Sequence, residues 1–346
     1  MKKKKTILIT LIIMLVLVSF SAIFYKPINK RAQSVLLSFN VVTGVDNLLV
    51  HYISVGQGDA IAINLPDNKV MLIDTGDTTK SANSACVNYL KENVFNTVKT
   101  NKIDYLVLSH ADADHIGGAL TVLKNFEVGT IFMPNVESNS QTYKNLCQHI
   151  ADNNIHATTD YSGLVIDNGS YQIQVFGPLN FTDTNDSCVV IKISYAGFSF
   201  LFTGDIEATV DGEFVDKYNQ ELDCDVLKVA HHGSSGASSE KFLACVTPEY
   251  AVISCGTGNR YNHPHQEALE RLNDIGAKTY RTDLLGNIMF VAGADYGLAE
   301  LDGDYTIIGF KFNYLYIVII VDSLLALNIV IVAASKPKRD KTKKHK

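Results

Sequence analysis

The chain has 346 residues, of which 47% are hydrophobic and 19% are charged, and this is typical of a globular protein with one or two domains. Residues 2–5 carry a charge of +4 and residues 336–346 carry +6, so the formal net charge of −6 leaves −16 on residues 6–335. A body this acidic argues against a protein that binds DNA by general electrostatic attraction.

The N-terminal segment begins with MKKKK and then runs to Phe24 without a charged residue. This apolar run is long enough to cross a bilayer as a helix. The alternative is a cleaved signal peptide, because small residues stand near Ala22 at suitable spacing. We predict that residues 1–30 form a membrane anchor or signal segment, and the length of the apolar run favours the anchor.

The region from residue 45 to residue 300 alternates between strand and helix patterns. Apolar runs and turn residues predict a β-meander over 47–77, a β-rich stretch over 163–203 with a hairpin at Ala196 and Gly197, and strands near 103–108, 128–133, 225–230, 250–254, 277–281 and 287–292. Helices are predicted near 82–99, 118–125, 141–153, 207–218, 239–245 and 265–275. Strands come first, then strands and helices alternate, and the same order then repeats, so the region consists of two similar halves. Two such halves predict one α/β domain, with two sheets face to face and helices outside.

The C-terminal region contains a second apolar run, 314–335, which is of bilayer length although Asp322 and Asn328 interrupt it. A basic tail over 336–346 follows, and segments rich in Lys and Arg mark the cytoplasmic ends of membrane spans. We therefore predict a transmembrane helix over 312–335, both termini in the cytoplasm and an extracellular domain at the cell membrane. The alternative is an amphipathic or core helix docked on the domain.

The segment SHADADHIGG, residues 109–118, directly follows a predicted buried strand. It brings four potential ligands within six positions, namely His110, Asp112, Asp114 and His115. Grouped on one turn, these side chains would repel one another or stay poorly solvated without a cation, and Zn²⁺ or Mn²⁺ accepts mixed nitrogen and oxygen ligands. The alternative is a polar loop with capping aspartates. The density of ligands favours a metal site.

The segment HADADH resembles the HxHxDH signature of the metallo-β-lactamase fold, with Asp112 in place of the second histidine. VGQGDA and LIDTG precede it, and FTGD and VAHHGSSGASS follow it. In this order the motifs resemble the hydrolase domain of ComEC-type competence proteins and their stand-alone relatives. The resemblance covers residues 48–292. It implies a four-layered αββα sandwich with two divalent metal ions, Zn²⁺ or Mn²⁺.

The resemblance also implies which residues bind the metals, and all of them are histidines or aspartates on loops. They are His110 and Asp112 for a first site, Asp114, His115 and His231 for a second site, and Asp205 as a bridge between the two. His232 is a weaker candidate. Asp74 either orients the ligands or caps a turn, and Gln57 and Asp59 lie either at the pocket rim or in a glycine-rich connection.

One departure from the family pattern concerns the first site. Its usual third histidine is missing between Gly177 and Ser187. Asp186, Asn185 or a water molecule would take its place. We therefore expect the first site to bind its metal more weakly than the second. Whether one metal or two are bound is left undecided.

Catalytic roles are expected for Asp114 and for His263, which matches a position near the substrate pocket in the family that the sequence resembles. With two metals, a bridging water becomes a hydroxide nucleophile, which Asp114 orients and deprotonates, while His263 contacts a phosphate or protonates the leaving group. Because ligation rich in carboxylates suits phosphate esters, we predict a membrane-anchored, metal-dependent phosphodiesterase. The candidate substrates are cell-wall polymers such as phosphorylcholine esters, nucleotides and DNA. Alternatives are a ComEC-like nuclease linked to competence and a catalytically impaired binding domain.

Overall fold

The computed structural model describes residues 47–134, 136, 138–177, 184–293 and 297–301. The predicted membrane segments 1–30 and 312–335 and the basic tail 336–346 lie outside these residues. Within the described ranges, no helix combines the length and the apolar character that a membrane crossing requires.

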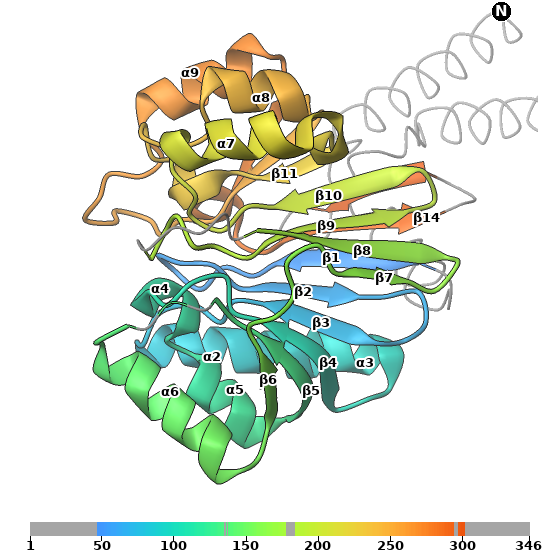
Figure 1. Ribbon diagram of the computed structural model, residues 1–346, viewed down its shortest axis with the longest axis vertical. Coiled ribbons are helices and arrows are strands. Elements are labelled where there is room, and N and C mark those ends of the chain that lie inside the picture. The colour runs from blue at the N-terminus through green and yellow to red at the C-terminus, as the bar shows by residue number, and fades with distance from the viewer. Residues whose placement is uncertain (1–46, 135, 137, 178–183, 294–296, 302–346) are drawn as a thin grey trace, which may run out of the picture. The chain divides into compact units, whose positions relative to one another are not determined.

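Two mixed sheets face each other, and helices cover the outer side of each sheet (Figure 1). The first sheet has the strand order β15-β14-β1-β2-β3-β4-β5-β6, and the second has the order β13-β12-β11-β10-β9-β8-β7. This arrangement confirms the predicted four-layered αββα sandwich.

The strands of the first sheet are β1 (Leu48–Tyr52), β2 (Ile61–Asn64), β3 (Val70–Ile73), β4 (Lys102–Val107), β5 (Glu127–Phe132), β6 (His156–Thr158), β14 (Ile288–Gly293) and β15 (Gly297–Leu301). Those of the second sheet are β7 (Val165–Asp167), β8 (Tyr171–Phe176), β9 (Val190–Tyr195), β10 (Phe198–Phe202), β11 (Val226–Lys228), β12 (Tyr250–Ile253) and β13 (Lys278–Arg281).

The α-helices are α2 (Lys80–Tyr89), α3 (Phe95–Val98), α4 (Ala113–Ile116), α5 (Ala119–Asn125), α6 (Gln141–Asp152), α7 (Ala208–Tyr218), α8 (Glu240–Val246), α9 (Gln266–Asp274) and α10 (Thr282–Leu285). A π-helical turn (Leu90–Val94) joins α2 to α3, and 3₁₀ turns lie at Asn219–Leu222 and Ala230–Gly233. In Figure 1 the helices α7, α8 and α9 cover the second sheet, and α2, α5 and α6 cover the first.

The predicted β-meander is confirmed, because β1 pairs antiparallel with β2 and β2 with β3. The hairpin at Ala196 and Gly197 is also confirmed, and both residues have positive φ values of 52° and 85°. The first and second halves of the sequence do not each form one sheet, however. β14 returns to pair with β1 and so belongs to the first sheet, with Leu48 opposite Ala292. Sequence periodicity alone does not show which strands become neighbours.

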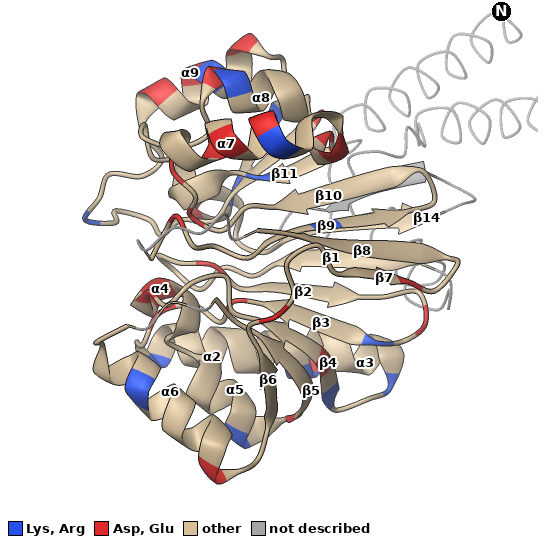
Figure 2. Cartoon of the chain, in the orientation of Figure 1, with Lys and Arg blue, Asp and Glu red and all other residues tan. Residues whose placement is uncertain are grey.

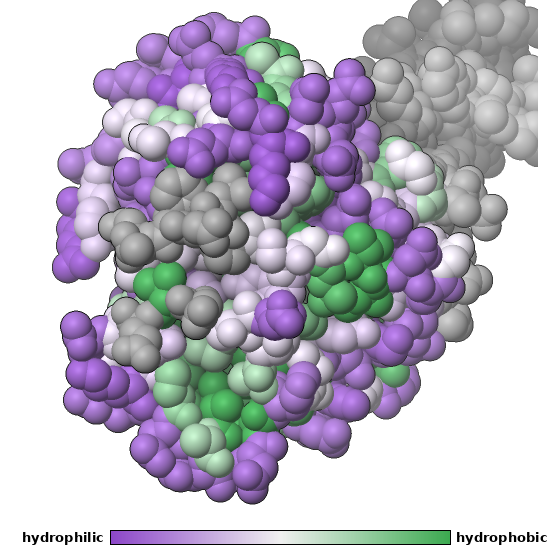
Figure 3. Space-filling view, viewed as in Figure 1, coloured by the Kyte–Doolittle hydropathy of each residue, from purple (hydrophilic) through white to green (hydrophobic). Residues whose placement is uncertain are grey.

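Side-chain alternation along the strands divides the apolar residues among three layers. Phe200 and Phe202 on β10 pack between the sheets, whereas Leu201 packs toward the helices of its own sheet. Between the sheets the Tyr52 ring lies 6.1 Å from that of Phe290 and 6.3 Å from that of Phe202, measured between centroids. The outer face of α7–α9 is largely hydrophilic (Figure 3), so the apolar side of each of these helices faces its sheet.

His51 on β1 faces the helix layer and is buried. Its Nε2 donates to Oδ1 of Asn64 at 2.9 Å, and its Nδ1 accepts from the hydroxyl of Tyr89 at 3.0 Å. Burial lowers the pKa of His51 from 6.5 to about 4, although the Asn64 hydrogen bond raises it. His51 is therefore neutral in the folded protein at pH 7.

We expect His51 to make the domain sensitive to acid. The unfolded chain takes up a proton on this residue near pH 6.5, but the folded chain does so only near pH 4, so the free energy of unfolding falls as the pH drops through this window. The loss from this group is about 3 kcal/mol. Urea titrations should show a shallower loss for His51→Gln, which cannot titrate. Parallel pH profiles of the two proteins would contradict this assignment.

Candidate metal centre

Polar loops from both sheets meet at one edge of the sandwich. β3 and β4 are parallel neighbours, as are β10 and β11, and the carboxyl ends of parallel strands share an edge. Asp74 follows β3, residues 109–115 follow β4, Asp205 follows β10, and His231 and His232 follow β11. Figure 2 shows acidic residues at α4 and in loops along this edge. The topology therefore brings the predicted motifs together.

Four buried residues form what we call the central cluster: Asp59, His115, Asp205 and His232. One potential ligand atom of each lies within 4.8 Å of those of the other three. Nε2 of His115 is 3.2 Å from Oδ2 of Asp205, and Nε2 of His232 is 3.3 Å from the same oxygen. Two imidazoles and two carboxylates at this spacing can enclose one divalent cation.

Several buried polar atoms at this edge have no hydrogen-bond partner among the described residues. They are Nε2 of His110, His115 and His232 and Oδ1 of Asp59 and Asp205. Leaving a buried polar atom unpaired costs about 1–3 kcal/mol, so native proteins rarely do so without a ligand. A divalent metal would bind such nitrogen and oxygen atoms, and the residues present therefore fit one. The choice between Zn²⁺ and Mn²⁺ stays a prediction.

Hydrogen bonds on the far side of each imidazole aim its Nε2 at the cluster. Nδ1 of His115 lies 2.7 Å from Oδ2 of Asp74, and Nδ1 of His232 lies 2.9 Å from the carbonyl oxygen of Ser254. The hydroxyl and the amide of Ser109 donate to the two oxygens of Asp74 at 2.6 and 2.7 Å. Of the two roles considered for Asp74, these contacts fit the one that orients the ligands. Such contacts fix the ring tautomer that a metal ligand needs.

The central cluster is strongly coupled electrostatically. Burial would raise the pKa of Asp205, but the facing rings of His232 and His115 hold it well below its ordinary value. Burial would likewise lower the pKa of His115, but Asp205 and Asp74 raise it well above 6.5. Burial and the neighbouring His115 lower the pKa of His110 to about 3. Because metals bind neutral imidazole, a proton and a metal would compete for the ring of His115.

The structure brings the remaining predicted ligands close to the central cluster. His110 is buried, and its ring centroid lies 4.0 Å from that of His115. Oδ2 of Asp112 is 3.8 Å from Nε2 of His110, and Oδ2 of Asp114 is 3.3 Å from Nε2 of His232. The side chain of Asp112 is 45% exposed, so this carboxylate lies at the solvent side of the site.

His231 and His232 occupy different positions from those expected. His232 is buried in the central cluster, whereas the side chain of His231 is 25% exposed and its Nε2 lies 3.9 Å from Oδ2 of Asp205. Both residues have positive φ values, 50° and 53°, so the chain bends sharply after β11. Strand alternation cannot assign the two rings across such a bend. In the sequence, only the glycine that follows the two histidines in HHGSSG indicated this bend.

Asp59 belongs to the central cluster, although the sequence indicated only a place at the pocket rim or in a glycine-rich connection. It lies in the loop between β1 and β2, and its amide donates to the carbonyl oxygen of Asp114 at 3.2 Å. Asp186, one of the three candidates for the place of the missing histidine beside Asn185 and water, accepts a hydrogen bond from the amide of Glu207 at 3.4 Å. Residues 178–183 of that loop lie outside the described part of the chain.

His263 lies beside the cluster on the loop between β12 and α9. Its ring centroid is 5.5 Å from that of His231 and 6.2 Å from that of His232. Burial, together with His232 and His231, lowers the pKa of His263 to about 4. The free ring is therefore neutral at pH 7, and an anionic substrate beside it would raise its pKa and so favour proton donation.

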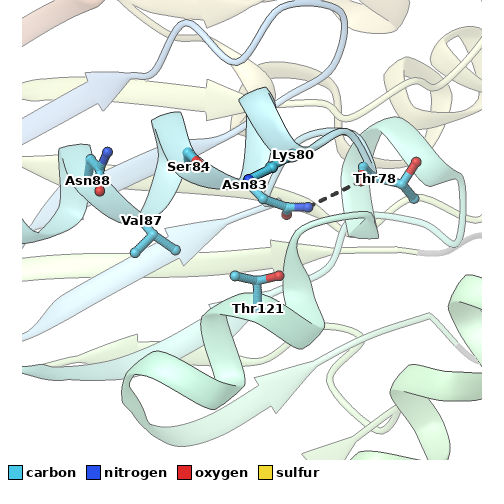
Figure 4. Close-up of a pocket in the computed structure, with 7 residues that line it drawn as sticks. All are labelled: Thr78, Lys80, Asn83, Ser84, Val87, Asn88 and Thr121. Carbon is cyan, nitrogen blue, oxygen red and sulfur yellow. Dashed lines mark hydrogen bonds between the residues drawn. The ribbon is translucent and has the colours of Figure 1, made fainter.

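An open cavity of about 370 Å³ lies elsewhere, between α2 and α5 (Figure 4). Hydroxyl and amide side chains line most of it, and the Asn83 amide donates to the carbonyl oxygen of Thr78 at 3.3 Å. No residue of the central cluster lines this cavity.

The sequence also matches a family model. The model described as Metallo-beta-lactamase superfamily matches residues 53–141, which include Asp59, Asp74 and the segment 109–118. Together with the αββα sandwich, this match defines the chain as a metallo-β-lactamase-fold protein.

Two curated relatives show to which group of metallo-β-lactamase-fold proteins the chain belongs. The chain is 32% identical to ComE operon protein 3 of Bacillus subtilis (strain 168), over 70% of this chain and 32% of that protein. It is 32% identical to competence protein ComA of Neisseria gonorrhoeae, over 69% of this chain and 31% of that protein. The chain is thus a ComEC-like protein of the metallo-β-lactamase fold, and the resemblance seen in the sequence is confirmed. It spans about a third of the length of these relatives.

Two solved structures with similar folds are more distant. Igni18, a metallo hydrolase from the archaeon Ignicoccus hospitalis, is 16% identical with a TM-score of 0.46, over 70% of this chain and 98% of that one. The metallo-beta-lactamase fold protein YhfI from Bacillus subtilis is 12% identical with a TM-score of 0.46, over 71% of this chain and 100% of that one.

Proposed function

We propose that this chain is a metal-dependent phosphodiesterase and that single-stranded DNA or a nucleotide is its preferred substrate class. The observation that carries the proposal is the set of unpaired Nε2 and Oδ1 atoms on His115, His232, Asp59 and Asp205, which are buried in one cluster. The names of relatives, which include Recombination protein 2 of Haemophilus influenzae, support a DNA-related substrate.

The proposed mechanism assigns binding and orientation to named residues. When bound, a divalent metal activates water near neutral pH and neutralises charge on a phosphate ester. His115 and His232 would offer Nε2 atoms to it, and Asp205 would offer a carboxylate between the two rings. The unpaired Nε2 of His110 lies beside this set. Asp114 is mostly buried; the ring of His232 holds its pKa well below the ordinary value, against the effect of burial. It is therefore ionised and able to orient a water.

The test is hydrolysis of bis-p-nitrophenyl phosphate by the full chain purified with Mn²⁺ or Zn²⁺. Activity should depend on the metal and fall by about 10²–10⁴-fold in Asp114→Ala. Asp216→Ala is the matched control, because this carboxylate lies on α7 and pairs with Lys241. If the wild-type protein binds no metal and hydrolyses no substrate, the result would instead support the alternative that the chain is a binding domain without catalytic activity.

The loop that carries His263 favours a nucleic acid over a choline ester. The Tyr261 side chain is exposed, its ring stacks on that of His263 at 5.6 Å and 23°, and the Arg260 guanidinium lies 4.7 Å from its centroid. The side-chain oxygen of Asn259 accepts from the amides of Tyr261 and His263, which makes this loop well defined. An aromatic ring with an adjacent cation suits a base and its phosphate, whereas the guanidinium would repel a quaternary ammonium.

We expect Tyr261→Ala to raise KM for an unstructured oligodeoxynucleotide about tenfold, because stacking contributes about 1–3 kcal/mol per base. Hydrolysis of a choline phosphate ester should change little. Tyr261→Phe keeps the aromatic face and should behave like the wild type with both substrates. Equal effects of Tyr261→Ala on the two substrates would argue against base stacking.

We also propose that residues 1–30 and 312–335 anchor the chain in the cell membrane with both termini in the cytoplasm and residues 45–300 outside. Their apolar runs and basic flanks support this topology. Protease added to intact cells should then digest the domain, whereas protection that ends only when the membrane is broken would place it inside.

A further inference from the structure

Lys228 is a lysine with no solvent exposure. It is the last residue of β11, where Val226 faces the space between the sheets and Leu227 faces the helices. By alternation Lys228 faces the same space as Val226, at the end of the strand where the metal centre lies. Fully buried lysines are rare, and they need a partner of opposite charge.

The partner of Lys228 is a member of the central cluster. Nζ of Lys228 lies 2.8 Å from Oδ2 of Asp59, and it also donates to the carbonyl oxygen of Val229 at 2.8 Å. Asp59 comes from the β1–β2 loop of the first sheet, so this ion pair joins the two sheets. Oδ1 of Asp59 has no hydrogen-bond partner in the described chain and lies 3.6 Å from Nδ1 of His232. One oxygen thus binds the ammonium and the other faces the cluster.

Lys228 differs in kind from the other cationic groups that face these carboxylates. His115 and His232 direct their Nε2 atoms at Asp205 inside the central cluster, where a metal would take both rings as ligands. The ammonium of Lys228 has no lone pair to offer a metal, and it contacts Oδ2 of Asp59, whereas Oδ1 of Asp59 faces His232. This ammonium is therefore the group able to balance Asp59 both before and after metal binding.

We infer that Lys228 is a positioning residue that acts as a resident cation: it holds Asp59 in place, lets the acidic centre assemble without metal, and limits the affinity for metal. This inference rests on the proposed metal-dependent function. It concerns folding and metal binding, however, and stands or falls on measurements that do not involve hydrolysis.

The experiment compares thermal unfolding of the full chain in EDTA and in saturating Mn²⁺ for the wild type and Lys228→Met. The variant leaves Asp59 buried and unpaired, so in EDTA its Tm should fall clearly below that of the wild type. Mn²⁺ would then supply the missing positive charge, so the rise in Tm on adding Mn²⁺ should exceed that of the wild type. The Kd for Mn²⁺ from calorimetry should be about tenfold tighter, since a nearby charge typically shifts such equilibria by that factor or more.

Two further variants make the result decisive. Asp59→Asn combined with Lys228→Met removes both charges, so its Tm in EDTA should recover toward that of the wild type and its metal-induced rise should not exceed the wild-type rise. Lys241→Met removes a lysine that pairs with Asp216 at the surface and should leave both quantities unchanged.

The outcomes separate a resident cation from an ordinary buried ion pair. An equal loss of Tm for Lys228→Met in EDTA and in Mn²⁺, or no loss in EDTA, overturns the inference. If Lys228→Met folds only with Mn²⁺, the inference is supported. If it folds in neither condition, the double variant decides, because a double variant that also fails to fold shows that Lys228 does not act through Asp59.

Discussion

Replacing Asp205 by Asn should abolish metal binding and reduce the proposed phosphodiesterase activity by at least about 10³-fold, which corresponds to about 4 kcal/mol of lost stabilisation. Oδ2 of this carboxylate lies within 3.2–3.3 Å of the Nε2 atoms of His115 and His232. An amide binds a divalent cation more weakly and brings no negative charge to the cluster. The measurement is the metal content of the purified protein by mass spectrometry, followed by kcat/KM.

The matched control is Asp211→Asn. Asp211 is also fully buried, but it lies on α7 and accepts hydrogen bonds from the amide and hydroxyl of Ser239 at 2.7 and 2.6 Å. This change should lower stability while leaving the metal content unchanged. Full metal content in Asp205→Asn would show that the central cluster is not where the metal binds.

Gly58→Ala should be nearly as damaging, although it adds only a methyl group. Gly58 has a φ of 124°, and a Cβ there would lie 2.1 Å from the carbonyl oxygen of Asp114. The β1–β2 loop would have to move away from α4 and carry Asp59 with it. We expect a loss of about 3–5 kcal/mol, from backbone strain and overpacking together, and weaker metal binding. Urea denaturation and metal calorimetry measure the two effects.

Gly56→Ala separates the clash from the strain. Gly56 also has a positive φ, 84°, but nothing lies within 4 Å of its Cβ position. It should therefore lose only about 1–2 kcal/mol from the backbone conformation and keep its affinity for metal. If Gly58→Ala behaves like Gly56→Ala, the close approach of this loop to Asp114 does not matter for the site.

Much of the fold could be predicted from the sequence, because local patterns determine its elements. The predicted helix at 141–153 and the hairpin at Ala196 and Gly197 agree with α6 and with the β9–β10 pair. Short elements such as α4 and β6 were missed, since four and three residues show no periodicity. The segment 109–118 indicated the site because consecutive loop residues stay close together whatever the rest of the chain does.

Contacts between the sheets could not be predicted in the same way. Asp59 meets Lys228 across 169 positions of sequence, and only the docking of the two sheets brings them together. Neither GQGD nor DVLKVA shows which side chains will face the other sheet at its edge. The roles of His231 and His232 likewise depended on two backbone angles that no neighbouring residue specifies.

The pairing of β1 with β14 also has a consequence for biosynthesis. Leu48 lies opposite Ala292, so the first strand of the sheet waits for a partner made about 240 residues later. At a typical rate of about 5–20 residues per second, the ribosome needs roughly 12–48 s to deliver it. During that interval one edge of β1 is open to other nascent chains, and this edge is where we would expect a chaperone to bind.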